Sequence, residues 1–205
     1  MSYTWQGMIE TKPAPKADRD VARILAGVKR PGSRRSRPAL VVLVGLPASG
    51  KSRVAGELRA QTGAVVLESD ALRRLLFARR TYSALESRRL FAAIHAAAEE
   101  LLADGVSVIL DATNVAEAER EPLYEMAERH GVKLVLVQVT APPSVLRRRL
   151  TRRATDGVGR SEAGVRVYER MRPRAEEIAR PHHVIDTSRN VEQALSVILK
   201  ELDEL

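Results

Sequence analysis

The feature that most constrains this chain is an apolar run that leads directly into a glycine-rich turn. Residues 41–52 read V-V-L-V-G-L-P-A-S-G-K-S and match the phosphate-loop pattern G-x-x-x-x-G-K-[ST] at every fixed position. Gly45 and Gly50 permit backbone angles that a Cβ would hinder, so successive N–H groups can surround a polyphosphate. Lys51 supplies a cation for the β and γ phosphates, and the Ser52 hydroxyl suits Mg²⁺. The predicted nucleotide-binding residues are therefore Gly45, Leu46, Pro47, Ala48, Ser49, Gly50, Lys51 and Ser52.

The rest of the chain alternates short apolar runs with helical patterns, which predicts an α/β fold. Strands are predicted at residues 40–44, 64–67, 106–110, 133–139 and 183–185. Helices are predicted at residues 51–61, 72–77, 83–103, 117–129, 142–153 and 163–178, and from residue 191 onward. This order favours a doubly wound, parallel five-stranded sheet of the P-loop NTPase/kinase kind, with ligands at the carboxyl ends of its strands.

Two parts of the chain differ in composition. Residues 1–38 are expected to form an N-terminal helical and basic appendage with a linker, and residues 39–205 the phosphate-loop domain. Within the appendage, residues 18–29 predict a helix whose apolar face packs on the main domain, and Trp5 is expected to pack there too. Residues 30–37 combine proline, glycine and arginine, and serve either as a nucleic-acid contact or as a solvated tether.

Composition excludes several classes of protein. The chain has no cysteine, which excludes disulfides and thiolate metal sites and fits a reducing, cytoplasmic location. No apolar run approaches the roughly 20 residues of a membrane span, and the N-terminus lacks the layout of a secretory signal, so no membrane association is expected. The net charge of +8 favours polyanionic partners, either nucleic acid or phosphorylated small molecules, although arginine also serves solubility. Aromatic residues make up only 3% of the chain, and no stacking platform for single strands is evident.

Acidic residues follow two of the predicted strands. Asp111 comes directly after V-S-V-I-L and is predicted to help Ser52 hold Mg²⁺ beside the phosphate loop; alternatively it caps the next turn. Asp70 follows the second strand and is predicted to be the base that accepts a proton from an attacking hydroxyl. Arg73 lies one helical turn further on and can neutralise the phosphate or the acceptor. The alternative is a helix N-cap at Asp70 followed by an ordinary surface arginine.

An arginine-rich helix predicts a lid at about residues 144–165. Arg149 and Arg153 are spaced i, i+4 and project from one face, where a guanidinium can stack on a base or bind phosphate oxygens. Residues 155–159 contain two glycines and suit a hinge for this lid. A plain surface helix is the alternative. The alternative candidates for these contacts, on the same helix, are Arg147, Arg148 and Arg152.

Three further motifs carry weaker signals. His182 and His183 begin a strand in which adjacent side chains face opposite ways, so joint metal binding is not expected. His95 lies within a helix and is expected to be a packing residue. The segment 186–188, D-T-S, ends the last strand and either borders the adenine or forms a simple turn.

The phosphate loop, the two acidic motifs and the arginine-rich helix together resemble the predicted-kinase group of P-loop proteins. That group includes the kinase domain of phage polynucleotide kinase and is related to gluconate kinases and zeta-toxin-like kinases. The resemblance covers residues 39–188 and rests on the phosphate loop, S-D-A-L-R at 69–73, L-D-A-T-N at 110–114 and the arginine-rich helix, in that order. It implies that Asp70 is the general base and that Arg73 contacts the acceptor. It also implies that of Arg149 and Arg153, one lies against adenine and the other on the phosphates. Ala112 interrupts the family's Asp-Thr-Asn pattern, which loosens that alignment.

The sequence thus predicts an ATP- and Mg²⁺-dependent kinase that phosphorylates a hydroxyl group. The predicted catalytic residues are Lys51, Asp70, Arg73 and Arg153. The acceptor favoured by the resemblance and the basic charge is the 5′-hydroxyl of RNA or DNA. One alternative is a small-molecule kinase acting on a sugar acid, an antibiotic or a nucleotide sugar. The other is an ATP-binding module without catalysis that signals its occupancy to a partner.

Overall fold

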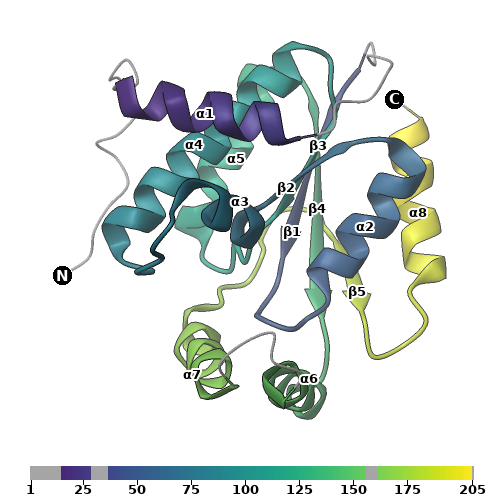
Figure 1. The fold of residues 1–205 in the computed structure, drawn as a ribbon. Helices are drawn as coiled ribbons and strands as arrows, with labels where there is room; N and C mark the ends of the chain where they lie inside the picture. The colour runs from purple at the N-terminus through teal and green to yellow at the C-terminus, as the bar shows by residue number, and fades with distance from the viewer. Residues whose placement is uncertain (1–14, 29–36, 156–160, 205) are drawn as a thin grey trace.

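The computed structural model describes residues 15–28, 37–155 and 161–204 (Figure 1). Predictions for Trp5, for most of the 30–37 linker and for the glycines of the 155–159 hinge lie outside the described residues, as does the side chain of Arg153. In chain order the elements are α1 (Pro15–Gly27), β1 (Ala39–Val44), α2 (Lys51–Thr62), β2 (Val65–Glu68), α3 (Ser69–Leu76), α4 (Ala84–Ala103), β3 (Val108–Asp111), α5 (Glu117–Arg129), β4 (Lys133–Thr140), α6 (Pro143–Thr155), α7 (Ser161–Met171), the 3₁₀ turn η1 (Arg172–Arg174), β5 (His183–Asp186) and α8 (Glu192–Asp203).

The strands form one parallel sheet in the order β2-β3-β1-β4-β5, as the alternating pattern predicts. α2 and α8 cover one face, while α1, α3, α4 and α5 cover the other (Figure 1). From β1 the chain passes to β2 at one edge, returns to β3 beside β1, and then crosses to β4 and β5 on the other side, so the strand order switches at β1. Ligands of doubly wound sheets bind at such a switch point, and the phosphate loop leaves β1 there.

The side chains of β1 contribute to two hydrophobic cores, one on each face of the sheet. All six of its residues are buried. Successive side chains of a strand point to opposite faces, so Leu40, Val42 and Val44 join the core under α4 and α5. Ala39, Val41 and Leu43 join the core under α2 and α8. A strand buried on both faces reads as a continuous apolar run, which is the pattern seen in the sequence.

α1 belongs to the larger of these cores. Val21 and Ile24 are buried in it, and Asp20 forms an ion pair with Arg89 of α4 at 2.6 Å. The prediction that an amphipathic helix before the linker packs on the main domain is confirmed. Its bounds are Pro15–Gly27 rather than 18–29.

The predicted helix 163–178 is too long. α7 ends at Met171 and is followed by the short turn η1, which contains Pro173. Proline lacks the N–H that a helix interior needs, and its ring clashes with the preceding turn. Residues 175–180 instead run without helix toward β5, and the Glu176 amide donates to the Val115 carbonyl at 2.9 Å. We call residues 175–180 the return strap.

α6 and α7 contain most of the segment predicted as a lid, and they lie together at the end of the sheet that carries the phosphate loop (Figure 1). Leu146 and Leu150 of α6 pack with Tyr168 of α7 around Ala48 of the phosphate loop. The predicted lid therefore has a small apolar core against the loop, and its function as a lid stays a prediction. Within the described ranges, no helix is both long and apolar enough to cross a membrane.

Candidate functional site

The phosphate loop has the glycine-dependent geometry that its motif predicts. A Cβ on Gly45 would lie 2.3 Å from the Val139 carbonyl oxygen, so no other residue fits without moving the strand. The Gly45 amide donates to the Thr113 carbonyl at 2.9 Å and ties the loop to the turn after β3. Gly50 has a φ of 102° and Ala48 a φ of 65°, both in the left-handed region. The backbone is thus held in a shape that ordinary residues disfavour.

Lys51 lies across this loop. Its Nζ donates to the carbonyls of Gly45 at 2.9 Å and Leu46 at 3.1 Å, and only 9% of the residue is exposed. α2 begins at Lys51 and has no side-chain N-cap. The positive end of this helix and the lysine ammonium therefore meet at the mouth of the loop, where an anion is favoured.

Asp111 and Ser52 meet beside the loop, as predicted for a magnesium site. Burial raises the pKa of Asp111, and the hydrogen bond with Ser52 and the Lys51 charge oppose that rise. Asp111 Oδ2 is buried without a hydrogen-bond partner, as is Ser49 Oγ. A buried carboxylate oxygen needs a partner, so these atoms fit a cation and a phosphate respectively.

No group of three or more His, Cys, Asp or Glu residues in the described ranges could hold a metal ion. Ser52 and Asp111 would therefore share Mg²⁺ with oxygens of a bound phosphate and of water, which is the usual arrangement for this ion.

Asp70 lies in the first turn of α3, directly after β2. It is exposed, and its charge raises the pKa of Asp111. Glu68, which pairs in register with Asp111, has its pKa raised by burial, then by Asp111 and, to a lesser degree, by Asp70. Three carboxylates thus gather at the ends of β2 and β3. Glu68, not Asp70, occupies the N-cap of α3, so the alternative interpretation of Asp70 as a cap is wrong.

Arg73 is buried rather than an ordinary surface arginine. Its guanidinium donates to Glu86 of α4 at 2.5 Å and to Ser87 at 3.3 Å. Only 7% of the residue is exposed. The structure therefore brings Arg73 to the start of α4, one helical turn from Asp70. Its predicted contact with the acceptor stays a prediction.

Arg149 binds the phosphate loop itself. One terminal nitrogen donates to the carbonyls of Ala48 and Ser49 at 3.2 and 3.3 Å and to Thr187 Oγ1 at 2.8 Å. The other donates to the Thr187 carbonyl at 2.8 Å. Thr187 in turn donates its hydroxyl to Ser49 O at 2.5 Å. The segment after β5 is therefore part of the loop's scaffold, a role that D-T-S alone did not reveal.

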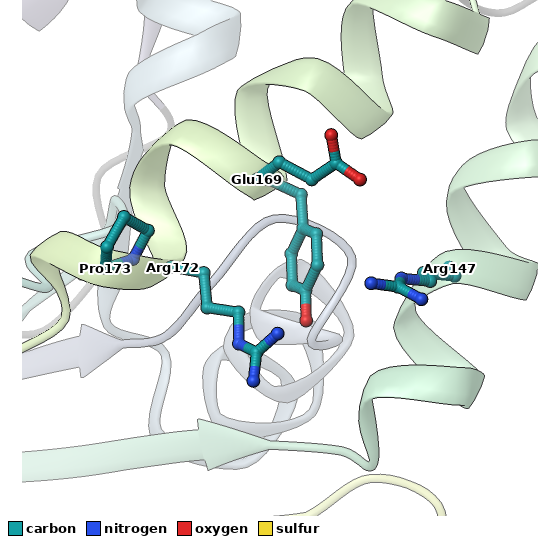
Figure 2. A pocket seen from close by; sticks show the side chains of 5 residues that line it. Arg147, Glu169, Arg172 and Pro173 are labelled. Atoms are coloured by element: carbon teal, nitrogen blue, oxygen red, sulfur yellow. The ribbon is translucent and has the colours of Figure 1, made fainter.

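A hollow of about 360 Å³ opens beside this contact. It is lined by Ala48, Gly50, Arg53, Arg148, Arg149, Arg152 and Thr187. The arginines of α6 thus divide between two places, because Arg147 lines a separate hollow of about 300 Å³ with Tyr168, Glu169 and Arg172 (Figure 2). Arg53 of α2 joins the first hollow and was not predicted. Two of the alternative arginines of α6, Arg148 and Arg152, line the first hollow together with Arg149.

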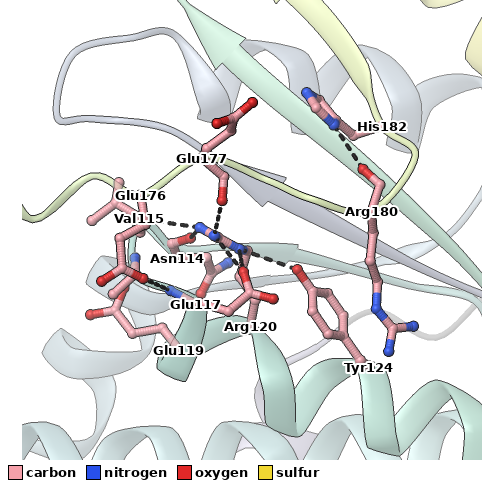
Figure 3. A network of polar contacts seen from close by, with 11 residues as sticks. Asn114, Val115, Glu117, Glu119, Arg120, Tyr124, Glu176, Glu177, Arg180 and His182 are labelled. Carbon is pink, nitrogen blue, oxygen red and sulfur yellow. Dashed lines mark hydrogen bonds and ion pairs between the residues drawn. The ribbon is translucent and has the colours of Figure 1, made fainter.

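Arg120 is a second residue that sequence reasoning missed. It is fully buried, and its guanidinium donates to the carbonyls of Asn114 and Val115 at 3.0 and 2.9 Å and of Glu177 at 2.9 Å. Glu117 neutralises its charge at 2.5 Å. Figure 3 shows the guanidinium between these groups. Arg120 therefore joins the turn after β3, which supports Gly45, to the return strap from the lid.

Comparisons with known proteins agree with this fold. Residues 40–178 match the model of the family described as AAA domain. The KTI12 homolog of Bos taurus is 35% identical over 147 residues, which are 69% of this chain and 40% of that protein. The chain thus spans less than half the length of this relative.

Two solved structures share the fold at low sequence identity. Chaetomium thermophilum Kti12 in complex with ADP-AlF3 has a TM-score of 0.64 at 21% identity, covering 80% of this chain and 97% of that one. Mycobacterium tuberculosis APS kinase CysC in complex with AMPPNP and APS has a TM-score of 0.63 at 21% identity, covering 82% and 98%. These likenesses show a P-loop NTPase/kinase-like fold. The finer resemblance to phage polynucleotide kinase stays a prediction.

Proposed function

Because the chain belongs to the AAA domain family and has a P-loop kinase-like fold, we propose that it is an ATP-dependent phosphotransferase that moves the γ-phosphate of ATP to a hydroxyl group. One observation carries the proposal. Exposed Asp70 lies in the first turn of α3, two residues after Glu68, and Glu68 pairs in register with the buried Asp111 beside Ser52. A solvent-facing carboxylate beside a phosphate loop is the arrangement that phosphoryl transfer to an alcohol requires.

The nucleotide side of the reaction falls to the loop, α2 and the lid. Lys51 exchanges its two loop carbonyls for the β and γ phosphates of ATP, which accept its donors with full charge. Mg²⁺, held by Ser52 and Asp111, would neutralise developing charge on the same phosphates. Arg148 and Arg152 face the hollow next to the loop and are placed to bind the rest of the nucleotide.

The acceptor side depends on Asp70. Its carboxylate accepts the proton of the hydroxyl as the oxygen forms a bond to the γ-phosphorus. The bond between that phosphorus and the β-γ bridging oxygen breaks, and ADP leaves. General-base assistance of this kind contributes about 10²- to 10⁴-fold to the rate.

The proposed acceptor is the 5′-hydroxyl of RNA or DNA, in keeping with the net charge of +8 and the S-D-A-L-R motif. A small-molecule hydroxyl is the competing acceptor, and the APS kinase whose fold this chain shares holds APS in its structure. A panel of acceptors separates the two.

A second candidate function is an ATP-binding module that transfers no phosphate to an alcohol. The KTI12 homolog, 35% identical over 147 residues, favours it, because that likeness covers most of this chain without naming a kinase. In this case the γ-phosphate would stay on the nucleotide or go to water.

The test is transfer of radiolabelled γ-phosphate from ATP to 5′-hydroxyl RNA, 5′-hydroxyl DNA, sugars and nucleosides. We expect a labelled alcohol, and Asp70→Asn should lower kcat about 10²- to 10⁴-fold while ATP affinity is kept. Asp18→Asn, an exposed carboxylate on α1, is the matched control and should change neither. Label found only in inorganic phosphate would overturn the phosphotransferase proposal and favour the second function. Full activity in Asp70→Asn would instead overturn the role of Asp70 as the base.

A further inference from the structure

The turn between α3 and α4 carries an unusual surface. Leu75, Tyr82 and Leu85 are 39%, 66% and 71% exposed, and they are three of the five large hydrophobic side chains exposed in the described part of the chain. They come from the end of α3, the turn and the start of α4. We call these three residues, together with exposed Arg79 and Arg80 from the same turn, the acceptor-side platform.

The turn is held in an unfavourable backbone conformation. Tyr82 has a φ of 53°, a left-handed conformation that a bulky aromatic residue rarely adopts. Glu86 maintains it by accepting from the Thr81 amide at 2.6 Å, the Thr81 hydroxyl at 2.7 Å and the Tyr82 amide at 3.3 Å. Strain of this kind persists only where the surroundings enforce it, and it gathers at functional sites.

The ring of Tyr82 has one supported side. The Arg73 guanidinium carbon lies 4.9 Å from the ring centroid, so a cation backs the aromatic ring. Arg73 is itself fixed by Glu86 and lies one helical turn from Asp70. The exposed remainder of the ring is therefore a rigid flat surface, backed by a residue that lies one helical turn from the proposed base.

The charge around the ring is of one sign. Residues 73–89 contain six arginines and a single acidic residue, Glu86, which is buried against Arg73. Arg89 is paired with Asp20, but Arg79 and Arg80 are exposed beside Tyr82. A flat aromatic surface flanked by cations matches the chemistry of single-stranded nucleic acid, whose bases stack on aromatic rings and whose phosphates attract arginine.

We infer that the acceptor-side platform binds the 5′-terminal bases of a single-stranded nucleic acid, with a base stacked on Tyr82 and backbone phosphates on Arg79 and Arg80. The inference rests on the proposed function in so far as the bound 5′ end then lies next to Asp70. It also revises the expectation of no stacking platform. One tyrosine suffices where the fold exposes it, and neither the low aromatic content nor the T-Y-S sequence signals that exposure.

The test is binding of a short 5′-hydroxyl oligonucleotide, labelled at its 3′ end, measured by fluorescence anisotropy in the presence of ADP. Tyr82→Gly removes the ring and suits the left-handed backbone, so the fold is not endangered. We expect it to weaken binding about tenfold or more, whereas Tyr82→Trp stays within about twofold of the wild-type chain. Val197→Ala, which trims another exposed apolar side chain on α8, is the matched control and should bind as the wild-type chain does.

The basic half of the platform has its own measurement. Arg79→Gln with Arg80→Gln should lower the slope of log affinity against log salt by about 0.7 for each phosphate that is no longer neutralised. Lys200→Gln on α8 removes a cation whose side chain is 80% exposed and should leave the slope unchanged. An unchanged slope in the double variant overturns the assignment of phosphates to these arginines.

Failure of the platform and failure of the kinase proposal give different results. Tyr82→Gly that binds and phosphorylates the oligonucleotide like the wild-type chain overturns the platform alone. Tyr82-dependent binding without any phosphate transfer supports the platform and overturns the kinase proposal. A wild-type chain that does not bind the oligonucleotide, and labels only small molecules, overturns the platform while the kinase proposal stands.

Discussion

Arg120 and Arg73 are both buried arginines paired with a glutamate, but the fold uses their guanidinium groups differently. Arg120 is fully buried and donates to three backbone carbonyls from two chain segments, with Glu117 as its counter-charge and the Tyr124 hydroxyl as a further acceptor. Arg73 donates to the side chains of Glu86 and Ser87 and presents one face to the exposed ring of Tyr82.

This difference indicates a structural role for Arg120 and a role in ligand binding for Arg73. A guanidinium that satisfies carbonyls of two chain segments fixes those segments, and nothing outside the protein can reach it. A guanidinium bonded to side chains at the surface edge leaves part of its neighbourhood open to a ligand. We therefore expect the Arg120 cluster to control stability and the Arg73 cluster to control the acceptor.

Arg120→Met is the most severe way to test this contrast. It removes the guanidinium from the carbonyls of Asn114, Val115 and Glu177 and from the Glu117 carboxylate, and of these only Val115 keeps another donor among the described residues, the Glu176 amide. We therefore expect a loss of about 3–5 kcal/mol in the free energy of unfolding. Urea unfolding measures it. Arg174→Met is the control, because that side chain is 60% exposed and its contact with Glu119 is 3.6 Å long. It should cost less than about 1 kcal/mol. Equal stabilities for the two variants would contradict the architectural role of Arg120.

Arg73→Gln should destabilise the chain less and impair acceptor binding more. We expect a loss of about 1–3 kcal/mol, since Glu86 keeps its three bonds to the turn, and a rise in the acceptor KM as Tyr82 loses its support. Steady-state kinetics with varied acceptor and saturating ATP measures the KM.

The size of the effect on kcat sharpens the interpretation. A fall in kcat at saturating acceptor would mean that Arg73 also touches the reacting groups, as the kinase resemblance implies. An unchanged KM and kcat would contradict both roles.

The two regions also differ in how far the sequence predicted them. The phosphate loop follows from local requirements: Gly45 has no room for a Cβ, and Lys51 and Ser52 follow it at fixed spacing. Asp111 is predictable for the same reason, since the end of a buried strand beside β1 faces the loop.

The missed residues depend on contacts between distant segments. Arg120 reads as one more helical arginine until the return strap, 57 residues away, brings the Glu177 carbonyl to it. Glu86 reads as an ordinary first-turn glutamate of α4. Only the folded turn shows that it holds Arg73 and the strained Tyr82. Thr187 likewise gains its role from Ser49, 138 residues earlier.

Arg149 extends the contrast to the nucleotide side. It binds the loop carbonyls as Arg120 binds those of the turn, yet it also borders a hollow as Arg73 borders a surface. We expect Arg149→Lys, which keeps the charge but loses the fork of donors, to raise the KM for ATP about tenfold and leave the acceptor KM unchanged. Arg147→Lys on the same helix lines the other hollow and is the matched control. A change in acceptor KM, or none in ATP KM, would argue against a nucleotide-side role.

Acidification should lower the free energy of unfolding through His95, which lies on α4, by a smaller amount than the substitutions above. Burial lowers the pKa of His95 to about 4, against a partly compensating effect of Glu99. Between that value and the ordinary pKa of about 6.5 the unfolded chain binds more protons than the folded one, so stability rises with pH and is lost as pH falls through this window. We expect the wild-type chain to lose about 1 kcal/mol more than His95→Leu when pH is lowered from about 7.5 to about 5.5, measured by urea unfolding at both values. Parallel pH profiles for the wild-type chain and His95→Leu would mean that His95 stays solvated in the folded chain.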